Sequence, residues 1–226
     1  MSNRPATPRD GASLIIYDAS RNSVLMGRRA KKSRFVPDVF VFPGGGLEAH
    51  DWTVPTDRPL RQRVVNAVTQ TPTSQAKAQA LAMAAIRETA EETGLSISRP
   101  AKLQAELPEG WKPLLPSGHL PDASAIGYMG RAITPTESPI RFHARFFVCL
   151  RDIVDGQLRS NGELEDLQWI NLDDMRKYPM IDVQEFMLER LALALKNRGK
   201  ALEPYLFAYR NGRPAPKVDG APYDLV

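Results

Sequence analysis

The segment AAIRETAEETGL, residues 84 to 95, is the most informative stretch of the chain. Glu88, Glu91 and Glu92 stand at positions i, i+3 and i+4, so a helix projects all three carboxylates from one face. Like charges this close destabilise a helix unless a cation neutralises them, and carboxylate oxygens suit a hard divalent ion. Arg87 precedes Glu91 by four residues and can pair with it one turn later.

The residues before this segment extend the helix. From Ser74, which can act as the N-cap, to Thr93 the sequence is rich in Ala, Gln, Met and Glu and contains no proline, and Gly94 then supplies a C-terminal stop. A helix that ends in three clustered carboxylates is therefore predicted. Spacing alone leaves a second interpretation open, in which the acidic helix end is simply solvated and conventionally capped.

A short strand and a glycine cluster lie upstream. Residues 39 to 42 (VFVF) have strand composition, and Pro43 ends the strand. Glycines 44 to 46 indicate a loop with unusual backbone torsions. Residues 52 to 73 contain three prolines and are interpreted as an insertion, with one short helix expected over residues 60 to 68.

Both stretches resemble halves of the Nudix box, Gly-x5-Glu-x7-Arg-Glu-U-x-Glu-Glu-x-Gly-U with U apolar. RETAEETGL (87 to 95) matches the second half, and VFVFPGGGLE (39 to 48) resembles the strand and glycine loop where the box begins. If Gly45 is the box glycine, Asp51 stands where the pattern has Glu. In addition, 35 residues separate Asp51 from Arg87, where the pattern has seven. The box is thus split by 28 extra residues, which can bulge outward at small entropic cost.

The resemblance continues beyond the box and covers most of residues 11 to 195. The sequence is similar to a Nudix branch that includes peroxisomal coenzyme A diphosphatases and many bacterial proteins. Branch membership does not fix the substrate. The segments that carry this likeness are MGRRAKKSRFVPDVFVFPGG (26 to 45), RAITP (131 to 135), RFHARFF (141 to 147) and GELEDLQWI (162 to 170).

The resemblance implies an α/β (α+β) Nudix fold, a mixed β-sheet sandwiched between helices, with an insertion inside the box. We expect a single Nudix domain over residues 1 to 226, the insertion at 52 to 73 and a C-terminal extension at 200 to 226. The implied activity is hydrolysis of a nucleoside diphosphate linked to another group, with Mg2+ or Mn2+ as cofactor. By position, the implied metal ligands are Glu88, Glu91, Glu92 and the carbonyl of Gly44, with Arg87 orienting the glutamates.

The chemistry agrees with these residue types. A diphosphate is anionic, so carboxylates bind it only through metal ions, which neutralise developing charge and lower the pKa of an attacking water. The general base is open, because Nudix enzymes use either a box glutamate or a glutamate from a distant loop. The loop GELED (162 to 166) offers Glu163 and Glu165, although two acids beside a turn are more often solvated. The predicted catalytic residues are Glu91, Glu92, Arg87 and Glu165.

The predicted substrate-binding residues are Arg28, Arg29 and Gly45. Arg28 and Arg29 open the basic stretch RRAKKSR (28 to 34), which follows a predicted strand. Such a turn can meet a substrate phosphate, or it can be solvated. Specificity is expected to reside in the insertion and in the proline-rich loop at 107 to 123.

Several substrates fit the implied activity. Coenzyme A or acyl-coenzyme A is the first expectation, while NADH, nucleotide sugars and oxidised nucleoside triphosphates stay open. The rival class is a non-catalytic Nudix-fold module that senses a nucleotide. Asp51 and the insertion favour this rival, whereas the complete set of helix glutamates with Arg87 argues against it.

Composition is that of an ordinary globular protein. The 226 residues are 42% hydrophobic and 25% charged, which argues against a disordered or fibrous chain. No apolar run approaches the roughly 18 residues of a membrane helix, and the N-terminus lacks a secretory h-region. We therefore expect a cytoplasmic protein with no membrane partner.

Charge and cysteine content narrow the partners. Lys and Arg number 30 against 26 Asp and Glu, which mildly favours anionic ligands without the basic, aromatic segment of a stable nucleic-acid partner. Cys149 is the only cysteine, so no intrachain disulfide forms, and its apolar neighbours place it in a buried strand. A helix at 182 to 196, with a capping-box-like start at Asp182 and Glu185, packs either on the sheet or against a second subunit of a homodimer.

The remaining predicted elements follow from local composition. Strands are expected at 13 to 17, 24 to 26, 125 to 133, 142 to 150, around Trp169 and at 205 to 209, with turns at Asp155-Gly156 and Asn211-Gly212.

Overall fold

A mixed sheet of nine strands runs through the centre of the computed structural model, which describes residues 5–33, 36–71, 73–102, 104–196 and 203–223. Within these ranges the main strand order is β11-β2-β1-β9-β8-β12-β15, with β3 added beside β2 and β4 beside β1. The sheet is mixed because β1 pairs with β9, and β8 with β12, in parallel. The strands are β1 (Arg9–Asp18), β2 (Ser23–Arg29), β3 (Phe40–Val41), β4 (Gly44–Gly46), β5 (Leu95–Ser96), β6 (Ser98–Pro100), β7 (His119–Pro121), β8 (Gly127–Ile133), β9 (Phe142–Leu150), β10 (Asp155–Gly156), β11 (Leu164–Asn171), β12 (Tyr205–Phe207), β13 (Tyr209–Arg210), β14 (Arg213–Pro214) and β15 (Lys217–Val218).

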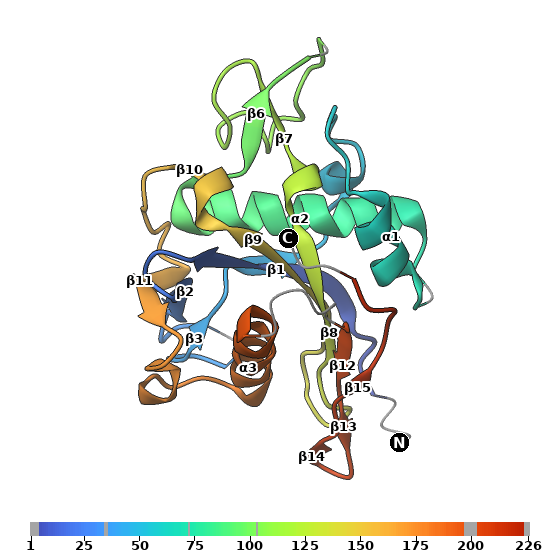
Figure 1. Ribbon diagram of the computed structural model, residues 1–226, viewed down its shortest axis with the longest axis vertical. Coiled ribbons are helices and arrows are strands. Elements are labelled where there is room, and N and C mark those ends of the chain that lie inside the picture. Colours follow the sequence, from blue (N-terminus) through green and yellow to red (C-terminus); the bar gives the residue numbers. More distant parts are fainter. Residues whose placement is uncertain (1–4, 34–35, 72, 103, 197–202, 224–226) are drawn as a thin grey trace.

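Helices cover both faces of this sheet. The helices α1 (Gln62–Thr69) and α2 (Gln75–Thr93) lie on one face, and α3 (Asp182–Lys196) lies on the other (Figure 1). Alternate residues of β1 serve the two layers: Leu14 and Ile16 pack in the α1–α2 core, whereas Ile15 packs in the α3 core. A strand buried on both faces reads as a continuous apolar run, which explains the sequence LIIY in β1. The expected fold class, a mixed sheet between helices, is confirmed.

Helix α2 has the boundaries that local chemistry predicts. The hydroxyl of Ser74 accepts a hydrogen bond from the backbone N–H of Lys77, and Gly94 ends the helix in the left-handed conformation at φ 71°. The interior of α2 is rich in alanine, and the helix is buried along most of its length, where it contacts β1 of the sheet, α1 and the 3₁₀ helix Ala49–Trp52. Val64 and Val68 of α1 are fully buried in the same core.

Several local predictions are confirmed, and three are wrong. Strand β9 covers residues 142 to 150 as expected, with Cys149 buried in it. Glycines 44 to 46 form strand β4, paired with β1, instead of the predicted loop. Asp155-Gly156 forms strand β10, which pairs with β5, instead of a turn. Asp182 is the first residue of α3, so it does not cap the helix from outside. The helix predicted at 182 to 196 coincides with α3.

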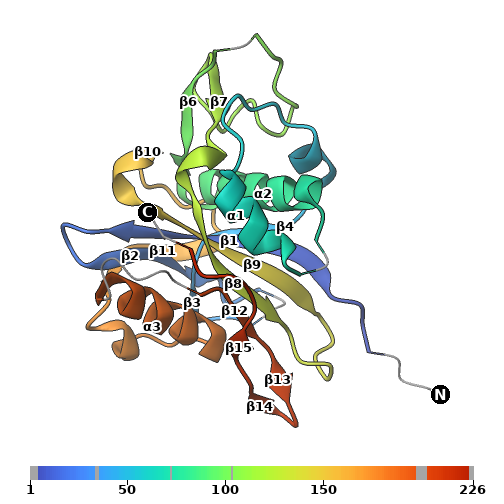
Figure 2. The same ribbon diagram turned by 45° about the vertical axis from the view of Figure 1, so that its right-hand side comes forward.

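Two excursions project from the central sheet and its helices. Residues between β6 and β7 project beyond α2 (Figure 2), and the fully buried Trp111 anchors this excursion in the α1–α2 core. The C-terminal residues return to the sheet as β12 and then form the β13–β14 hairpin. Its turn residues, Asn211 and Gly212, have φ values of 52° and 72°, as the Asn-Gly signal predicts. No helix within the described ranges is long and apolar enough to cross a membrane.

Candidate active site

A buried ion pair joins the two halves of the split box. The Nε and Nη2 atoms of Arg87 donate to Oδ1 and Oδ2 of Asp51 at 2.9 and 3.0 Å, and both side chains are almost completely buried. Asp51 lies in a short 3₁₀ helix, Ala49–Trp52, and also accepts the backbone N–H of Glu48 at 2.8 Å. Asp51 therefore holds Arg87 from the position where the box pattern has a glutamate.

Arg87 also holds two of the predicted metal ligands. Its Nη1 atom donates to Glu88 and to Glu91, each at 3.0 Å, and Nη2 donates to the carbonyl of Gly46 at 2.8 Å. Burial by itself lowers the pKa of Arg87, but the hydrogen bond with Asp51 and the nearby carboxylate charges more than offset this, so the pKa is raised. The guanidinium stays charged and organises this end of α2.

Two further contacts join α2 to the glycine strand β4. Glu92 is 5% exposed and accepts the backbone N–H of Gly44 at 2.8 Å. Glu88 packs against Gly45 so closely that a Cβ atom at Gly45 would lie 2.4 Å from its carboxylate. The chain needs glycine at position 45 because a carboxylate occupies the space of a side chain there.

The carboxylates carry more negative charge than their surroundings neutralise. Burial, together with the charges of Glu88 and Glu163, raises the pKa of Glu92 to about 8. Burial likewise raises the pKa of Glu88 to about 7, with Glu91 and Glu163 acting in the same direction. Burial lowers the pKa of Arg29, although the negative charges of Glu92 and Glu163 raise it in part. Buried carboxylates with raised pKa values mark a site that lacks positive charge.

The donor chemistry of this cluster fits a hard divalent cation. Oxygen-only ligands and excess negative charge are what Mg2+ and Mn2+ require. In the present side-chain arrangement, no three Asp, Glu, His or Cys side chains of the described residues converge on one point, since Arg87 holds Glu88 and Glu91. Residues 88, 91 and 92 and the backbone of Gly44 are brought together at one end of α2, as the sequence predicts, and they are the residues that would hold such an ion.

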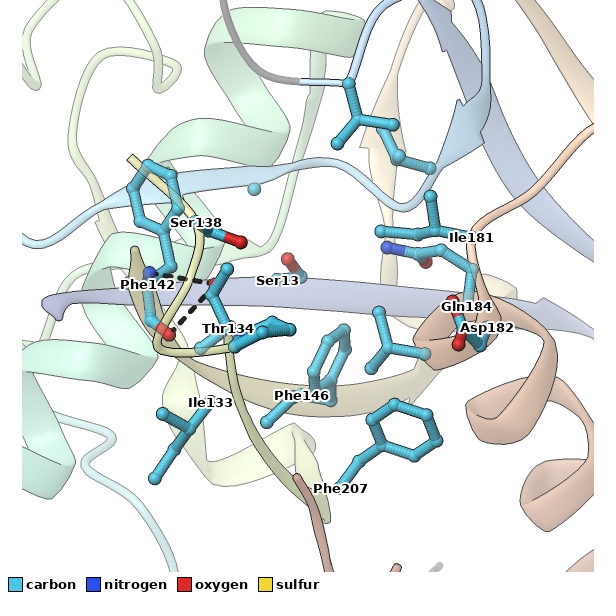
Figure 3. A pocket seen from close by; sticks show the side chains of 18 of the residues that line it. Ser13, Ile133, Thr134, Ser138, Phe142, Phe146, Ile181, Asp182, Gln184 and Phe207 are labelled. Carbon is cyan, nitrogen blue, oxygen red and sulfur yellow. Dashed lines mark hydrogen bonds between the residues drawn. The ribbon is translucent and has the colours of Figure 1, made fainter. Parts of the chain in front are cut away.

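A cavity of about 260 Å³ adjoins this cluster (Figure 3). Gly44, Gly45 and Arg29 line it and also belong to the carboxylate cluster, so cavity and cluster share one wall. The other walls come from segments far apart in the sequence: residues 11–13 of β1, residues 36 and 41, residues of β8, β9 and the turn between them (132–135, 138, 142, 144 and 146), residues 181–184 at the start of α3, and the C-terminal residues 207 and 209.

Two of the three predicted substrate-binding residues line this cavity. Arg29 and Gly45 do so, whereas Arg28 pairs with Asp38 at 3.2 Å and approaches Asp166 at 3.8 Å, both half exposed. The insertion and the proline-rich loop are the segments expected to carry specificity, but none of their described residues lines the cavity. Sequence reasoning missed Gln184, Phe207 and Tyr209, because a lone glutamine and strand aromatics give no signal that separates a binding residue from a structural one.

The structure distinguishes the two loop glutamates. The charge of Glu163 raises the pKa of both Glu88 and Glu92, which places it near the carboxylate cluster. Glu165 lies within β11, where its backbone stands opposite Arg28 of β2 in the strand register. Glu165 as a catalytic residue stays a prediction.

Solved structures with the same architecture are Nudix proteins. A NUDIX hydrolase from Alicyclobacillus acidocaldarius is 26% identical with a TM-score of 0.64, over 83% of this chain and 92% of that chain. A mutator MutT protein from Bacillus halodurans, 14% identical with a TM-score of 0.50, covers 93% of this chain and 97% of its own and shows the fold alone. A scan against family models and a search of curated proteins find no match.

Two features describe the class of protein to which this chain corresponds: an α+β fold, and an acidic helix end that packs on a glycine strand. The likeness to the Alicyclobacillus acidocaldarius enzyme, over most of both chains, supports a place for this chain in the Nudix superfamily.

The contact between Gly45 and Glu88 yields a matched pair of variants. Gly45→Ala puts a Cβ atom into the Glu88 carboxylate, whereas Gly46→Ala meets nothing within 4 Å. We expect Gly45→Ala to weaken Mn2+ binding by about tenfold or more, equivalent to at least about 1.4 kcal/mol, and Gly46→Ala to leave it unchanged. Isothermal titration calorimetry with MnCl2 measures both. Equal affinities for the two variants would show that Glu88 does not bind the ion.

Removal of one partner of the buried ion pair is expected to be costly. Asp51→Asn leaves Arg87 with less negative charge in a buried position, and we expect it to lower the free energy of unfolding by about 3–5 kcal/mol. The control is Asp38→Asn, which removes an exposed ion pair with Arg28 and is expected to cost less than about 1 kcal/mol. Denaturant unfolding followed by circular dichroism gives both values. Similar losses in the two variants would contradict the structural role assigned to Asp51.

Proposed function

We propose that the protein is a metal-dependent pyrophosphohydrolase that cleaves the diphosphate of a nucleoside diphosphate linked to another group. The single observation that carries this proposal is the shared wall of the site. Gly44 and Gly45 contact the carboxylates of α2 and also line the cavity. A ligand with one end in the cavity therefore has its adjoining phosphates beside the carboxylates.

The carboxylates supply the metal site in this proposal. Glu88, Glu91 and Glu92 with the Gly44 carbonyl would hold Mg2+ or Mn2+, and such an ion, when bound, would neutralise the diphosphate charge and lower the pKa of water. The residues of the chain do the positioning. Arg87 fixes Glu88 and Glu91, and the Gly44 N–H fixes Glu92. Arg29 lines the cavity next to Glu92, where its positive charge meets a substrate phosphate.

In the reaction, the oxygen of a water molecule bonds to a phosphorus atom of the diphosphate while the bond from that phosphorus to the bridging oxygen breaks. A carboxylate takes the proton of the water, and two phosphate-bearing products leave. Box glutamates Glu91 and Glu92 and loop glutamates Glu163 and Glu165 are the candidates for this base. The proximity of Glu163 to Glu88 and Glu92 supports Glu163 over Glu165.

Coenzyme A or acyl-coenzyme A is the first substrate class in this proposal, on the resemblance to the branch of coenzyme A diphosphatases. NADH, nucleotide sugars and oxidised nucleoside triphosphates contain the same reacting group and are the alternatives. The rival class is a nucleotide sensor without hydrolysis. The complete Asp51–Arg87 pair argues against a decayed box, because it retains the ion pair that holds the ligands in place.

Product analysis tests the activity. On a panel of coenzyme A esters, NADH, ADP-ribose, nucleotide sugars and 8-oxo-dGTP, we expect cleavage that requires Mg2+ or Mn2+, measured by mass spectrometry. Glu92→Gln should abolish turnover, because it removes a charged ligand while its amide oxygen can still accept the Gly44 N–H. Its melting temperature should not fall, since the variant removes a buried charge. Ligand binding by the native protein without products would favour the sensor.

The loop glutamates give a second matched pair. We expect Glu163→Gln to lower kcat by about 10²–10⁴, the usual contribution of a general base, and Glu165→Gln to change it little. Steady-state kinetics with the preferred panel substrate measures both variants, and Mn2+ titration shows whether the metal site is intact. Loss of turnover in Glu165→Gln alone would assign the base to Glu165, and normal turnover in both would assign it to the box.

A further inference from the structure

We propose that Gln184 is a specificity-determining residue whose side-chain amide donates a hydrogen bond to an acceptor atom of a nucleobase bound in the cavity. This inference rests on the proposed function for the identity of the ligand, but its test measures binding without hydrolysis. Gln184 belongs to the first turn of α3, lines the cavity and is 6% exposed. A buried amide at the wall of a cavity is available to a ligand only if it has a free polar atom.

The orientation of this amide is fixed by the backbone. Oε1 of Gln184 accepts a hydrogen bond from the N–H of Phe42 at 3.4 Å. A backbone N–H only donates, so the amide oxygen must face Phe42 and the Nε2 group must face away from it. Phe42 has this N–H available because it lies between strands β3 and β4. Figure 3 shows the nitrogen of Gln184 directed into the cavity.

The Nε2 group is therefore a donor without a protein partner. No other hydrogen bond of the Gln184 side chain occurs within the described part of the chain. A site that presents a fixed donor favours a ligand with an acceptor at that point, because a ligand without one leaves the donor desolvated and unpaired. Gln184 thus selects for a ring nitrogen or a carbonyl oxygen.

The walls around this donor suit a planar heterocycle. Phe146 and Phe207 are almost fully buried and line the cavity, as does Phe142. Aromatic faces stack on nucleobases with little sequence preference, so a polar contact is needed to choose among ligands. The volume of about 260 Å³ is below the roughly 300–1,000 Å³ typical of sites for whole drug-sized ligands, so the cavity accepts one end of a longer molecule.

The other end of that molecule is placed by the glycine wall. Gly44 and Gly45 separate the aromatic walls from Glu88 and Glu92, and Arg29 lies at the same wall. A nucleobase on Gln184 with its diphosphate toward Arg29 fits this order of groups. A flexible acyl chain would use the apolar walls but would not need an oriented donor.

The test is a binding cycle with ADP, the unit that coenzyme A, NADH and ADP-ribose share. Isothermal titration calorimetry in EDTA compares native protein, Gln184→Met and the control Gln168→Met, whose residue lies in β11 away from the cavity. We expect Gln184→Met to bind ADP about tenfold more weakly and Gln168→Met to bind it as the native protein does. Gln184→Glu, which keeps an oxygen for the Phe42 N–H but lacks the donor, should lose a similar factor if the Met variant proves unstable.

Ring analogues make the test specific for one atom. Native protein should bind one of 1-deaza-, 3-deaza- and 7-deaza-ADP about tenfold more weakly than ADP, and Gln184→Met should bind that analogue as it binds ADP. An equal loss for all three analogues, an unchanged affinity for ADP in both Gln184 variants, or no binding of ADP to the native protein would overturn the proposal. So would a dependence on Gln184 for 4′-phosphopantetheine in place of ADP. Binding that follows this pattern without any hydrolysis would instead refute the proposed function and leave the role of Gln184 standing.

Discussion

The buried contact between Asp51 and Arg87 is the interaction on which the rest of the site depends. A guanidinium has five N–H groups, and five hydrogen bonds leave Arg87: two to Asp51, one each to Glu88 and Glu91, and one to the carbonyl of Gly46. A buried charge is tolerated only when it is paired and fully hydrogen-bonded. Lysine, with three donors on a flexible stem, could not hold four partners in one plane.

This saturation fixes the distance between two segments that are far apart in the chain. Once the end of α2 is bound to residues 46 to 51, β4 must lie close against it. Gly45 then meets the carboxylate of Glu88, and the N–H of Gly44 meets Glu92. The same contact that brings the glutamates together also buries them, which raises their pKa values and creates the need for a cation. Positioning and electrostatics therefore have a common origin.

Elements with local signals could be predicted from the sequence. Ser74 and Gly94 fix the ends of α2 by capping, and the apolar run 142 to 150 coincides with β9. Arg28 and Arg29 show which information the sequence did not contain, namely the face of the sheet on which each side chain lies. Adjacent residues of a strand face opposite sides of the sheet, and Arg29 shares the phase of Leu25, which packs on the α2 side. Only the assembled sheet shows that a side chain on this face at position 29 lies near Glu92.

The positions of the loop glutamates and of the cavity walls are set by contacts between segments that are even farther apart in the sequence. Glu163 and Glu165 would share one face in a regular strand, but β11 begins at Leu164, and its register shifts between Glu165 and Gln168. The cavity walls require two parallel pairings, β1 with β9 and β8 with β12, that no neighbouring residues encode. Specificity therefore could not be located from sequence.

The split box shows why chemistry and specificity differ in this respect. The 28 extra residues leave the site after Asp51, and the apolar face of α1 packs on α2, so the chain returns to Arg87 without disturbing the ion pair. The catalytic end is thus built from the two halves of one sequence motif, joined by the ion pair, and both halves can be recognised along the chain in spite of the insertion. The binding end is assembled from the first strand, the strand β8, the start of α3 and the C-terminal Phe207. Each of these segments has an ordinary structural role in the fold, so only their spatial convergence distinguishes them as a binding site.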